Sequence, residues 1–269
     1  MQKHNFHTHT IYSDGHDSIR DMIEAAINNG FTSLGFSDHS YTYYQKLICV
    51  PYEFEDAYIA RIKSEAAGYA DKIKVYAGIE LDSESEIPHS DFDYILASVH
   101  DMVKNGVTLP IDTAPKFEQQ IIDEFYGGNS VDFAKAYFEN FVTHVKRNKV
   151  DIVGHIDVIT KYGLVDDQSD IYRDAAIEAV REISKYCKTF ELNTGAIARG
   201  LKTLPYPADF ILRELKALGC RIIVTSDCHF REKITTWFNE AEDYLTGLGF
   251  TKYENESLND RIHGLEMWK

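Results

Sequence analysis

Ile222-Ile223-Val224-Thr225-Ser226-Asp227-Cys228-His229 joins an apolar, β-branched run to a carboxylate and an imidazole at its end. Val75-Tyr76-Ala77-Gly78-Ile79-Glu80 is a second apolar run, and it also ends in a carboxylate. Short apolar runs of this kind indicate buried strands. Because longer segments with helical patterning separate them along the whole chain, the sequence predicts an α/β fold built around a parallel sheet.

The same reading extended outward from these two runs gives seven strands and six helices. The strands are expected near Asn5–Thr10, Ser33–Asp38, Lys74–Glu80, Tyr94–His100, Asp151–His155, Thr189–Asn193 and Arg221–Ser226. The helices are expected at about Ser18–Asn29, Glu53–Tyr69, Val131–Arg147, Ile171–Cys187, Pro207–Leu218 and Phe238–Thr246. Ser18 can cap the first helix with Asp21 at its third position, and Pro207 suits the first turn of the fifth.

Residues 101–130 stand out because they show little periodicity, two prolines and a Gly127-Gly128 pair. So long a connection within a compact domain is typically an active-site loop or lid, or else disordered. The chain contains no repeat and no linker that would divide it. We therefore expect residues 1–269 to form a single domain.

Composition limits the partners. The formal net charge of −15 argues against a nucleic-acid backbone, which is bound through lysine and arginine. A small phosphorylated substrate stays compatible with this charge, because bound divalent cations reverse the local sign of a pocket. The 4 cysteines lack a C-x-x-C pair, and no apolar stretch resembles a signal peptide or a membrane span. We expect a soluble, cytoplasmic protein with no membrane partner.

Histidines and carboxylates recur where the predicted strands end. Any one of these histidines could be an ordinary core or surface side chain. The carboxyl ends of strands in a β/α barrel gather at one mouth, however, so residues distant in sequence converge there. Imidazole and carboxylate groups are ligands of Zn, Mn and Fe, and the whole set predicts a metal site. Its members are His7, His9, His39, Glu80, His100, His155, Asp227 and His229.

Six segments resemble motifs of the PHP (polymerase and histidinol phosphatase) superfamily, in order and in spacing. They are Phe6-His7-Thr8-His9-Thr10, Phe36-Ser37-Asp38-His39, Gly78-Ile79-Glu80, Ala97-Ser98-Val99-His100, Gly154-His155-Ile156-Asp157 and Ser226-Asp227-Cys228-His229. Within the superfamily the chain is most similar to monofunctional histidinol-phosphate phosphatases, through Phe92-Asp93-Tyr94 and Glu191-Leu192-Asn193-Thr194. The resemblance runs from Asn5 to about Phe230.

The resemblance implies a distorted (β/α)7 barrel with three divalent metal ions (Zn, Mn or Fe) at the carboxyl ends of the strands. It assigns the first ion to His7, His9, Glu80 and Asp227, the second to Glu80, His100 and His155, and the third to His16, His39 and His229. His16 lies in the loop Ser13-Asp14-Gly15-His16-Asp17, and only the resemblance identifies it as a ligand.

Hydrolysis of a phosphate monoester requires a nucleophile and neutralisation of phosphoryl charge, and clustered metals supply both. A hydroxide shared by the first two ions would attack in line. Arg199 is the first candidate for a cation that binds phosphate, and Lys161 is the second. Gly195-Ala196-Ile197-Ala198 replaces the Ser-Gly-Leu stretch that precedes this arginine in the family.

The departing alcohol needs a proton, and Asp17 is a candidate donor. Asp17 could equally orient a ligand histidine, since such histidines lend their second nitrogen to a carboxylate. Three further aspartates share that orienting possibility, namely Asp14, Asp38 and Asp157.

The resemblance therefore implies hydrolysis of L-histidinol phosphate to L-histidinol and phosphate, a step of histidine biosynthesis. A second possibility is a PHP phosphoesterase for another small phosphate or a nucleotide, which a substrate panel would separate from the first. A third is a metal-stabilised binding module without turnover. The complete ligand set, the absence of an attached polymerase and the acidic charge weigh against this third possibility.

Overall fold

The computed structural model describes residues 2–43, 45–85 and 90–269. Within this part of the chain, nine strands form one sheet in the order β1-β2-β3-β4-β7-β8-β9-β11-β10. They are β1 (His4–Asn5), β2 (Ser33–Phe36), β3 (Lys74–Asp82), β4 (Tyr94–Ser98), β7 (Ile152–Val153), β8 (Thr189–Asn193), β9 (Arg221–Thr225), β10 (Lys252–Ser257) and β11 (His263–Trp268). Every pairing from β1 to β9 is parallel, whereas β11 pairs antiparallel with β9 and β10.

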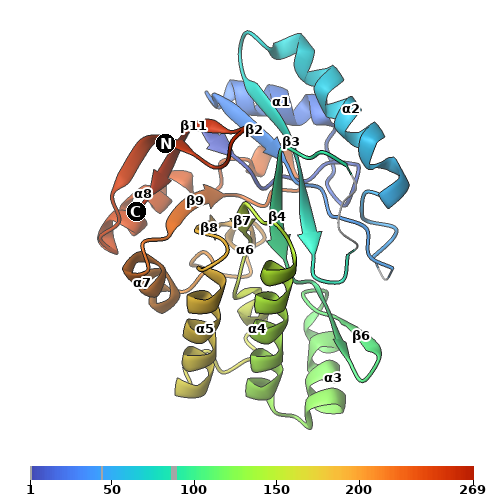
Figure 1. Ribbon diagram of the computed structural model, residues 1–269, viewed down its shortest axis with the longest axis vertical. Coiled ribbons are helices and arrows are strands. Elements are labelled where there is room, and N and C mark those ends of the chain that lie inside the picture. Colours follow the sequence, from blue (N-terminus) through green and yellow to red (C-terminus); the bar gives the residue numbers. More distant parts are fainter. Residues whose placement is uncertain (1, 44, 86–89) are drawn as a thin grey trace.

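The sheet curls until its two parallel edges meet at their carboxyl ends. Thr8, just after β1, forms a parallel bridge with Cys228, just after β9. The backbone N–H of His9 donates to the carbonyl oxygen of Cys228 at 3.0 Å. Strand β11 also lies beside β1. Nε2 of His4, in β1, is 2.9 Å from the carbonyl oxygen of Glu266, in β11. In Figure 1 both ends of the chain lie beside the hairpin that β10 and β11 form.

The longer helices lie around the outside of the curled sheet (Figure 1). The helices of the described part of the chain are α1 (Ile19–Asn28), α2 (Glu55–Ala66), α3 (Pro115–Tyr126), α4 (Ser130–Arg147), α5 (Asp170–Ile183), α6 (Gly195–Ala198), α7 (Asp209–Ala217) and α8 (Phe238–Gly247). The short α6 lies in the middle of the view in Figure 1. The chain also forms short 3-10 turns, η1 (Tyr52–Phe54), η2 (Ala67–Tyr69), η3 (Val158–Thr160) and η4 (Arg231–Lys233), of which η1 and η2 adjoin the two ends of α2. Ser18 and Asp21 form a capping box at α1, as predicted.

The inside of the curled sheet is packed with side chains and is not a channel. Phe6, Leu96 and Ile223 meet the C-terminal hairpin there, where Leu265 and Met267 are buried. The hydroxyl oxygen of Tyr94 lies 2.9 Å from the carbonyl oxygens of both Phe6 and Phe36, so its single hydrogen is shared between them. This apolar core fills the inside of the curled sheet. The polar side chains at the carboxyl ends of the strands therefore lie at one end of a filled interior.

The broad sequence prediction of an α/β fold is confirmed. All seven predicted strands have counterparts, although β1 and β7 are shorter than expected, and all six predicted helices are present. Two details are wrong. Residues 101–130 contain a hairpin, β5 (Asp101–Lys104) with β6 (Val107–Pro110), followed by α3 and the start of α4. Pro207 precedes its helix, which begins at Asp209 after the N-cap residue Ala208.

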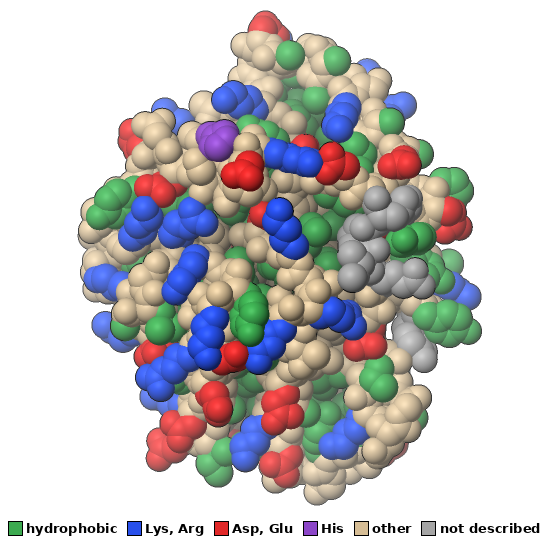
Figure 2. Space-filling model, in the orientation of Figure 1, with side chains coloured by type: hydrophobic (Ala, Val, Ile, Leu, Met, Phe, Trp, Pro, Cys, Tyr) green, Lys and Arg blue, Asp and Glu red, His purple; other side chains and the backbone are tan. Residues whose placement is uncertain are grey.

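The described surface carries mixed charge. On the face seen in Figure 2, lysine and arginine side chains lie among aspartate and glutamate, with apolar groups between them. Among the described residues, every helix is too short or too polar to cross a membrane.

Candidate metal centre

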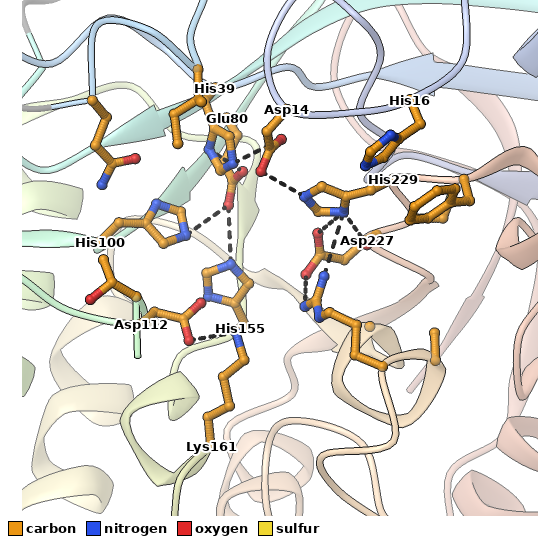
Figure 3. A pocket seen from close by; sticks show the side chains of 18 of the residues that line it. Asp14, His16, His39, Glu80, His100, Asp112, His155, Lys161, Asp227 and His229 are labelled. Atoms are coloured by element: carbon orange, nitrogen blue, oxygen red, sulfur yellow. Dashed lines mark hydrogen bonds and ion pairs between the residues drawn. The ribbon is translucent and has the colours of Figure 1, made fainter. Parts of the chain in front are cut away.

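The histidines and carboxylates predicted from strand ends do converge at one end of the sheet. His7 and His9 follow β1, Glu80 lies in β3, and Asp227 follows β9. His39, His100, His155 and His229 follow β2, β4, β7 and β9 in the same way. Figure 3 shows six of these side chains pointing toward a shared space, namely His39, Glu80, His100, His155, Asp227 and His229. Their convergence follows from the parallel topology, which brings all the carboxyl ends of these strands to one edge.

Glu80 lies at the centre of the cluster and is 1% exposed. Its Oε2 is 3.3 Å from Nε2 of His7 and 2.9 Å from Nδ1 of His39. Its Oε1 is 3.1 Å from Nε2 of His155 and 3.6 Å from Nε2 of His100. One carboxylate therefore has imidazole nitrogens beside each of its oxygens, which is the arrangement of a ligand able to bridge two ions.

Asp227 contributes the second carboxylate. Its Oδ1 lies 3.2 Å from Nε2 of His9 and 3.6 Å from Nε2 of His7. Asp227 has φ 47°, a left-handed conformation that aspartate tolerates better than most residues. This conformation occurs directly beside the Thr8–Cys228 bridge, where the two edges of the sheet meet.

Asp14 contributes the third carboxylate from the turn that follows β1. Its Oδ1 is 3.5 Å from Nδ1 of His9 and 3.6 Å from Nε2 of His39, and its Oδ2 is 3.0 Å from Nε2 of His229. The next residue, Gly15, has no room for a Cβ, because that atom would overlap the backbone of His9. This close approach holds the turn against the cluster.

These side chains form four overlapping groups whose ligand atoms lie within 4.8 Å of one another. The groups are His7, Glu80 and His155; His7, His9 and Asp227; His39, Glu80 and His100; and His9, Asp14, His39 and His229. Nε2 of His7, Nε2 of His9 and Oε2 of Glu80 are buried without a hydrogen-bond partner. Buried polar atoms require partners. A cation would satisfy all three atoms at once, so the donor set fits a metal centre.

The electrostatics of the cluster suit metal binding. Burial works against the charge on Glu80, yet the imidazoles of His7, His39 and His100 hold the pKa of this carboxyl well below its usual range. Burial, reinforced by two neighbouring imidazoles, lowers the pKa of His9 to about 4. Glu80 is consequently anionic and His9 neutral at pH 7. Despite burial, nearby carboxylates raise the pKa values of His7, His39 and His100, so metal binding would displace protons from these rings.

Two carboxylates that the sequence analysis did not select as orienting groups support the ligand histidines from behind. Oε2 of Glu191, on β8, is 2.8 Å from Nδ1 of His7, and its Oε1 accepts from the backbone N–H of His155 at 2.5 Å. Oδ2 of Asp82 accepts from the backbone N–H of His100 at 2.6 Å. Asp82 lies two residues after Glu80, so both side chains face the same side of β3. This spacing could have identified Asp82 from the sequence.

The aspartates named as orienting groups take other roles. The carboxylate of Asp38 accepts from the backbone N–H and hydroxyl of Thr10 at 2.7 and 2.9 Å and from the hydroxyl of Tyr58 at 2.7 Å. It thus fixes the turn after His9 rather than a histidine ring. Oδ2 of Asp157 accepts from the backbone N–H of Ala208 at 2.9 Å.

His16 and Asp17 are not brought into the cluster. The ring of His16 stacks on Phe230, with centroids 4.1 Å apart and planes at 10°, and Figure 3 shows it at the edge of the pocket. Asp14 occupies the position beside His39 and His229 that the resemblance gave to His16. Oδ2 of Asp17 accepts from the backbone N–H of Arg231 at 2.8 Å, and Asp17 is not among the residues that line the pocket.

Arg199 and Lys161, the two predicted cations, both line the pocket of about 1030 Å³ that opens onto the cluster. Arg199 is the C-cap residue of α6, and its Nη2 lies 3.1 Å from Oδ2 of Asp227. Nζ of Lys161 lies 2.6 Å from Oδ1 of Asp112. Arg199 is thus adjacent to a carboxylate of the cluster, whereas Lys161 pairs with Asp112.

The fold and this cluster define an α/β protein with a buried set of histidines and carboxylates that could hold metal ions. The PHP domain family matches residues 5–195, which include most of the cluster. The chain belongs to this family.

Individual relatives carry phosphatase names. A Schizosaccharomyces pombe protein named "Probable histidinol-phosphatase" is 25% identical over 257 residues, which span 87% of this chain and 82% of that protein. The histidinol phosphate phosphatase of Lactococcus lactis, crystallised with zinc, L-histidinol and phosphate, has a TM-score of 0.72 at 22% identity, covering 93% of this chain and 95% of that one. A candidate histidinol phosphatase from Listeria monocytogenes has a TM-score of 0.75 at 19% identity, covering 88% and 99%. At these identities the two structures establish similarity of fold.

Proposed function

We propose that this chain is a metal-dependent phosphomonoesterase that hydrolyses L-histidinol phosphate to L-histidinol and phosphate in histidine biosynthesis. The observation that carries the proposal is the buried Glu80 among five imidazoles, in a pocket that is also lined by Arg199. The curated relative named as a histidinol-phosphatase, aligned over most of both chains, supports the choice of substrate.

We propose three divalent ions, Zn, Mn or Fe. The first would be held by His7, His9 and Asp227 with Glu80, the second by Glu80, His100 and His155, and the third by Asp14, His39 and His229. The short distances from Asp14 to both histidines support this choice over His16 for the third ion. When bound, such ions provide a hydroxide nucleophile at neutral pH and neutralise the charge of the phosphoryl oxygens.

The side chains of this protein would bind and orient the substrate. Arg199 presents a planar fork of N–H donors to the pocket, which suits two phosphoryl oxygens. Lys161, which also lines the pocket, adds a second positive charge. For Asp17, the hydrogen bond to Arg231 supports a role in fixing the segment after His229, while proton donation by Asp17 stays a prediction.

We also propose that the curled sheet is a distorted (β/α)7 barrel and that residues 1–269 form one domain. Six consecutive parallel pairings among seven strands, together with the Thr8–Cys228 bridge, support the barrel. Pro110, Ile111, Asp112 and Thr113 line the pocket, which supports an active-site role for part of the 101–130 segment.

Phosphate release by purified protein loaded with Zn²⁺ or Mn²⁺ tests the function, with L-histidinol phosphate compared against nucleotides and sugar phosphates. We expect the highest kcat/KM for L-histidinol phosphate. A preference for another ester would make the chain a different PHP phosphoesterase. Absence of release from every ester, with metals bound, would favour a binding module without turnover.

A further inference from the structure

One carboxylate in the pocket has no part in the ligand groups. Among the described residues that line the pocket, four carry a carboxylate, and Asp14, Glu80 and Asp227 belong to the proposed metal centre. The fourth, Asp112, lies across the pocket from Asp14, next to Lys161 (Figure 3). If ions neutralise the other three, Asp112 is the remaining negative side chain among the described residues that line the pocket.

The backbone of Asp112 is fixed from two sides. Its N–H donates to Oε2 of Glu118 on α3 at 3.4 Å, and its carbonyl oxygen accepts from the hydroxyl of Tyr162, after η3, at 3.4 Å. The residue has φ 59°, in the left-handed region, so its side chain takes a direction that a regular strand could not give it. The Asp112 side chain is 14% exposed and that of Lys161 8%. The carboxylate is therefore held at the pocket wall and largely shielded from water.

The surroundings of Asp112 suit an organic group. Pro110 and Ile111 precede it on the same wall, and Leu47 and Ile48 also line the pocket. Phosphate would fill only the metal end of a pocket of about 1030 Å³. The alcohol part of a phosphate ester would then lie against an apolar wall that contains a single carboxylate.

We propose that Asp112 selects phosphate monoesters whose alcohol carries a protonated amine. This inference rests on the proposed function and names the class of substrate that the site prefers. In the free protein the positive charge of Lys161 offsets the negative charge of Asp112. A phosphate dianion beside Lys161 adds negative charge there, and an ammonium group of the same substrate next to Asp112 would offset it. Shielding from water strengthens the contact, because a charge-assisted hydrogen bond gains more where solvent competes less.

The test compares two ligands that differ only in the amine, L-histidinol and 3-(imidazol-4-yl)propan-1-ol. Their affinities for Zn²⁺-loaded protein are measured by calorimetry, and their phosphate esters are compared as substrates. The variant is Asp112→Asn, because asparagine keeps the side-chain volume and also tolerates the left-handed backbone. Asp123→Asn, on the exposed side of α3, is the matched control.

We expect wild-type protein to bind L-histidinol about 10–100-fold more tightly than the deamino alcohol, as for a hydrogen bond between charged groups. Asp112→Asn should remove most of this difference, and Asp123→Asn should keep it. Equal weakening of both ligands in Asp112→Asn would mean that Asp112 only positions Lys161, and it would overturn the proposal. So would wild-type protein that does not distinguish the two alcohols. Because binding is measured without turnover, failure of phosphate release would reject the proposed function while the binding comparison still decides the role of Asp112.

Discussion

Glu191 and His7 are both fully buried, and Oε2 of the carboxylate lies 2.8 Å from Nδ1 of the imidazole. Because a carboxylate can only accept, Nδ1 of His7 carries the proton and Nε2 is left facing Glu80 and Asp227. Glu191 thereby sets the tautomer and the ring orientation of a proposed metal ligand. Such a partner is a common feature of histidine ligands in metal sites.

Glu191→Gln should weaken metal binding without removing any ligand. The amide has one acceptor oxygen where the carboxylate has two, so it cannot satisfy His7 together with the backbone N–H of His155. We expect a loss of about 10–100-fold in metal affinity and kcat/KM, the usual effect of altering a partner of this kind. Metal titration with an activity assay measures both. Glu182→Gln, on the surface, is the control, and equal behaviour of the two variants would contradict the role of Glu191.

Glu80→Gln should have the larger effect, because the change removes the negative charge between two proposed ions. We expect loss of bound metal and of nearly all phosphate release, with the fold preserved. Elemental analysis, circular dichroism and a phosphate assay give the three readings. Full metal content with full activity would exclude Glu80 as a bridging ligand.

Arg199→Ala tests the proposed phosphate contact. Losing a charge-assisted hydrogen bond costs about 1.5–3 kcal/mol of binding free energy. We therefore expect kcat/KM to fall about 10–150-fold while the metals stay bound. Inhibition by inorganic phosphate should weaken in parallel. Arg181→Ala serves as the control, since Arg181 is an exposed arginine that pairs with Glu214 outside the pocket. If phosphate inhibition is the same in wild type and Arg199→Ala, the role passes to Lys161 or to the metals.

Gly78→Ala tests the packing that supports the site from below. A Cβ at Gly78 would overlap the ring of Tyr94, whose hydroxyl ties Phe6 to Phe36 inside the curled sheet. Overpacking of a filled core costs about 1–3 kcal/mol. Urea unfolding should show this loss, whereas Gly68→Ala, where a Cβ meets open space, should not lose stability. Equal stability of the two variants would argue against close packing around Tyr94.

The convergence of the histidines at one end of the sheet could be predicted from sequence, because each follows a short apolar run and a parallel topology brings the ends of such runs together. The 101–110 hairpin was missed although Asn105-Gly106 is a typical two-residue hairpin turn, with φ 52° and 76°. Strand β10 could not be found in this way. Its sequence Lys-Tyr-Glu-Asn-Glu-Ser is polar and mostly exposed, so no alternation of apolar residues marks it.

The turn of residues 13–17 marks a different limit. Sequence places Asp14, His16 and Asp17 within a few residues of one another, and only the path of the backbone decides which side chain faces the cluster. Gly15 brings that backbone against His9, which directs Asp14 inward, while His16 stacks on Phe230. Pattern alone cannot supply such a choice, because it depends on a contact between segments far apart in the chain.

Asp14→Ala and His16→Ala form a matched pair that decides between these neighbours. If Asp14 is the ligand, Asp14→Ala leaves the third ion with His39 and His229, and it should be lost while about two ions stay bound. Activity should then fall by at least about 10–100-fold, which is the usual effect of changing a residue that only hydrogen-bonds to a metal ligand. His16→Ala should keep three ions, because its ring contacts Phe230 rather than the cluster. Elemental analysis and kcat/KM are measured on both variants after the same metal loading, with melting temperature as the check on folding. The reverse result, two ions in His16→Ala and three in Asp14→Ala, would restore the ligand set implied by the family resemblance and would mean that the turn moves when metal binds.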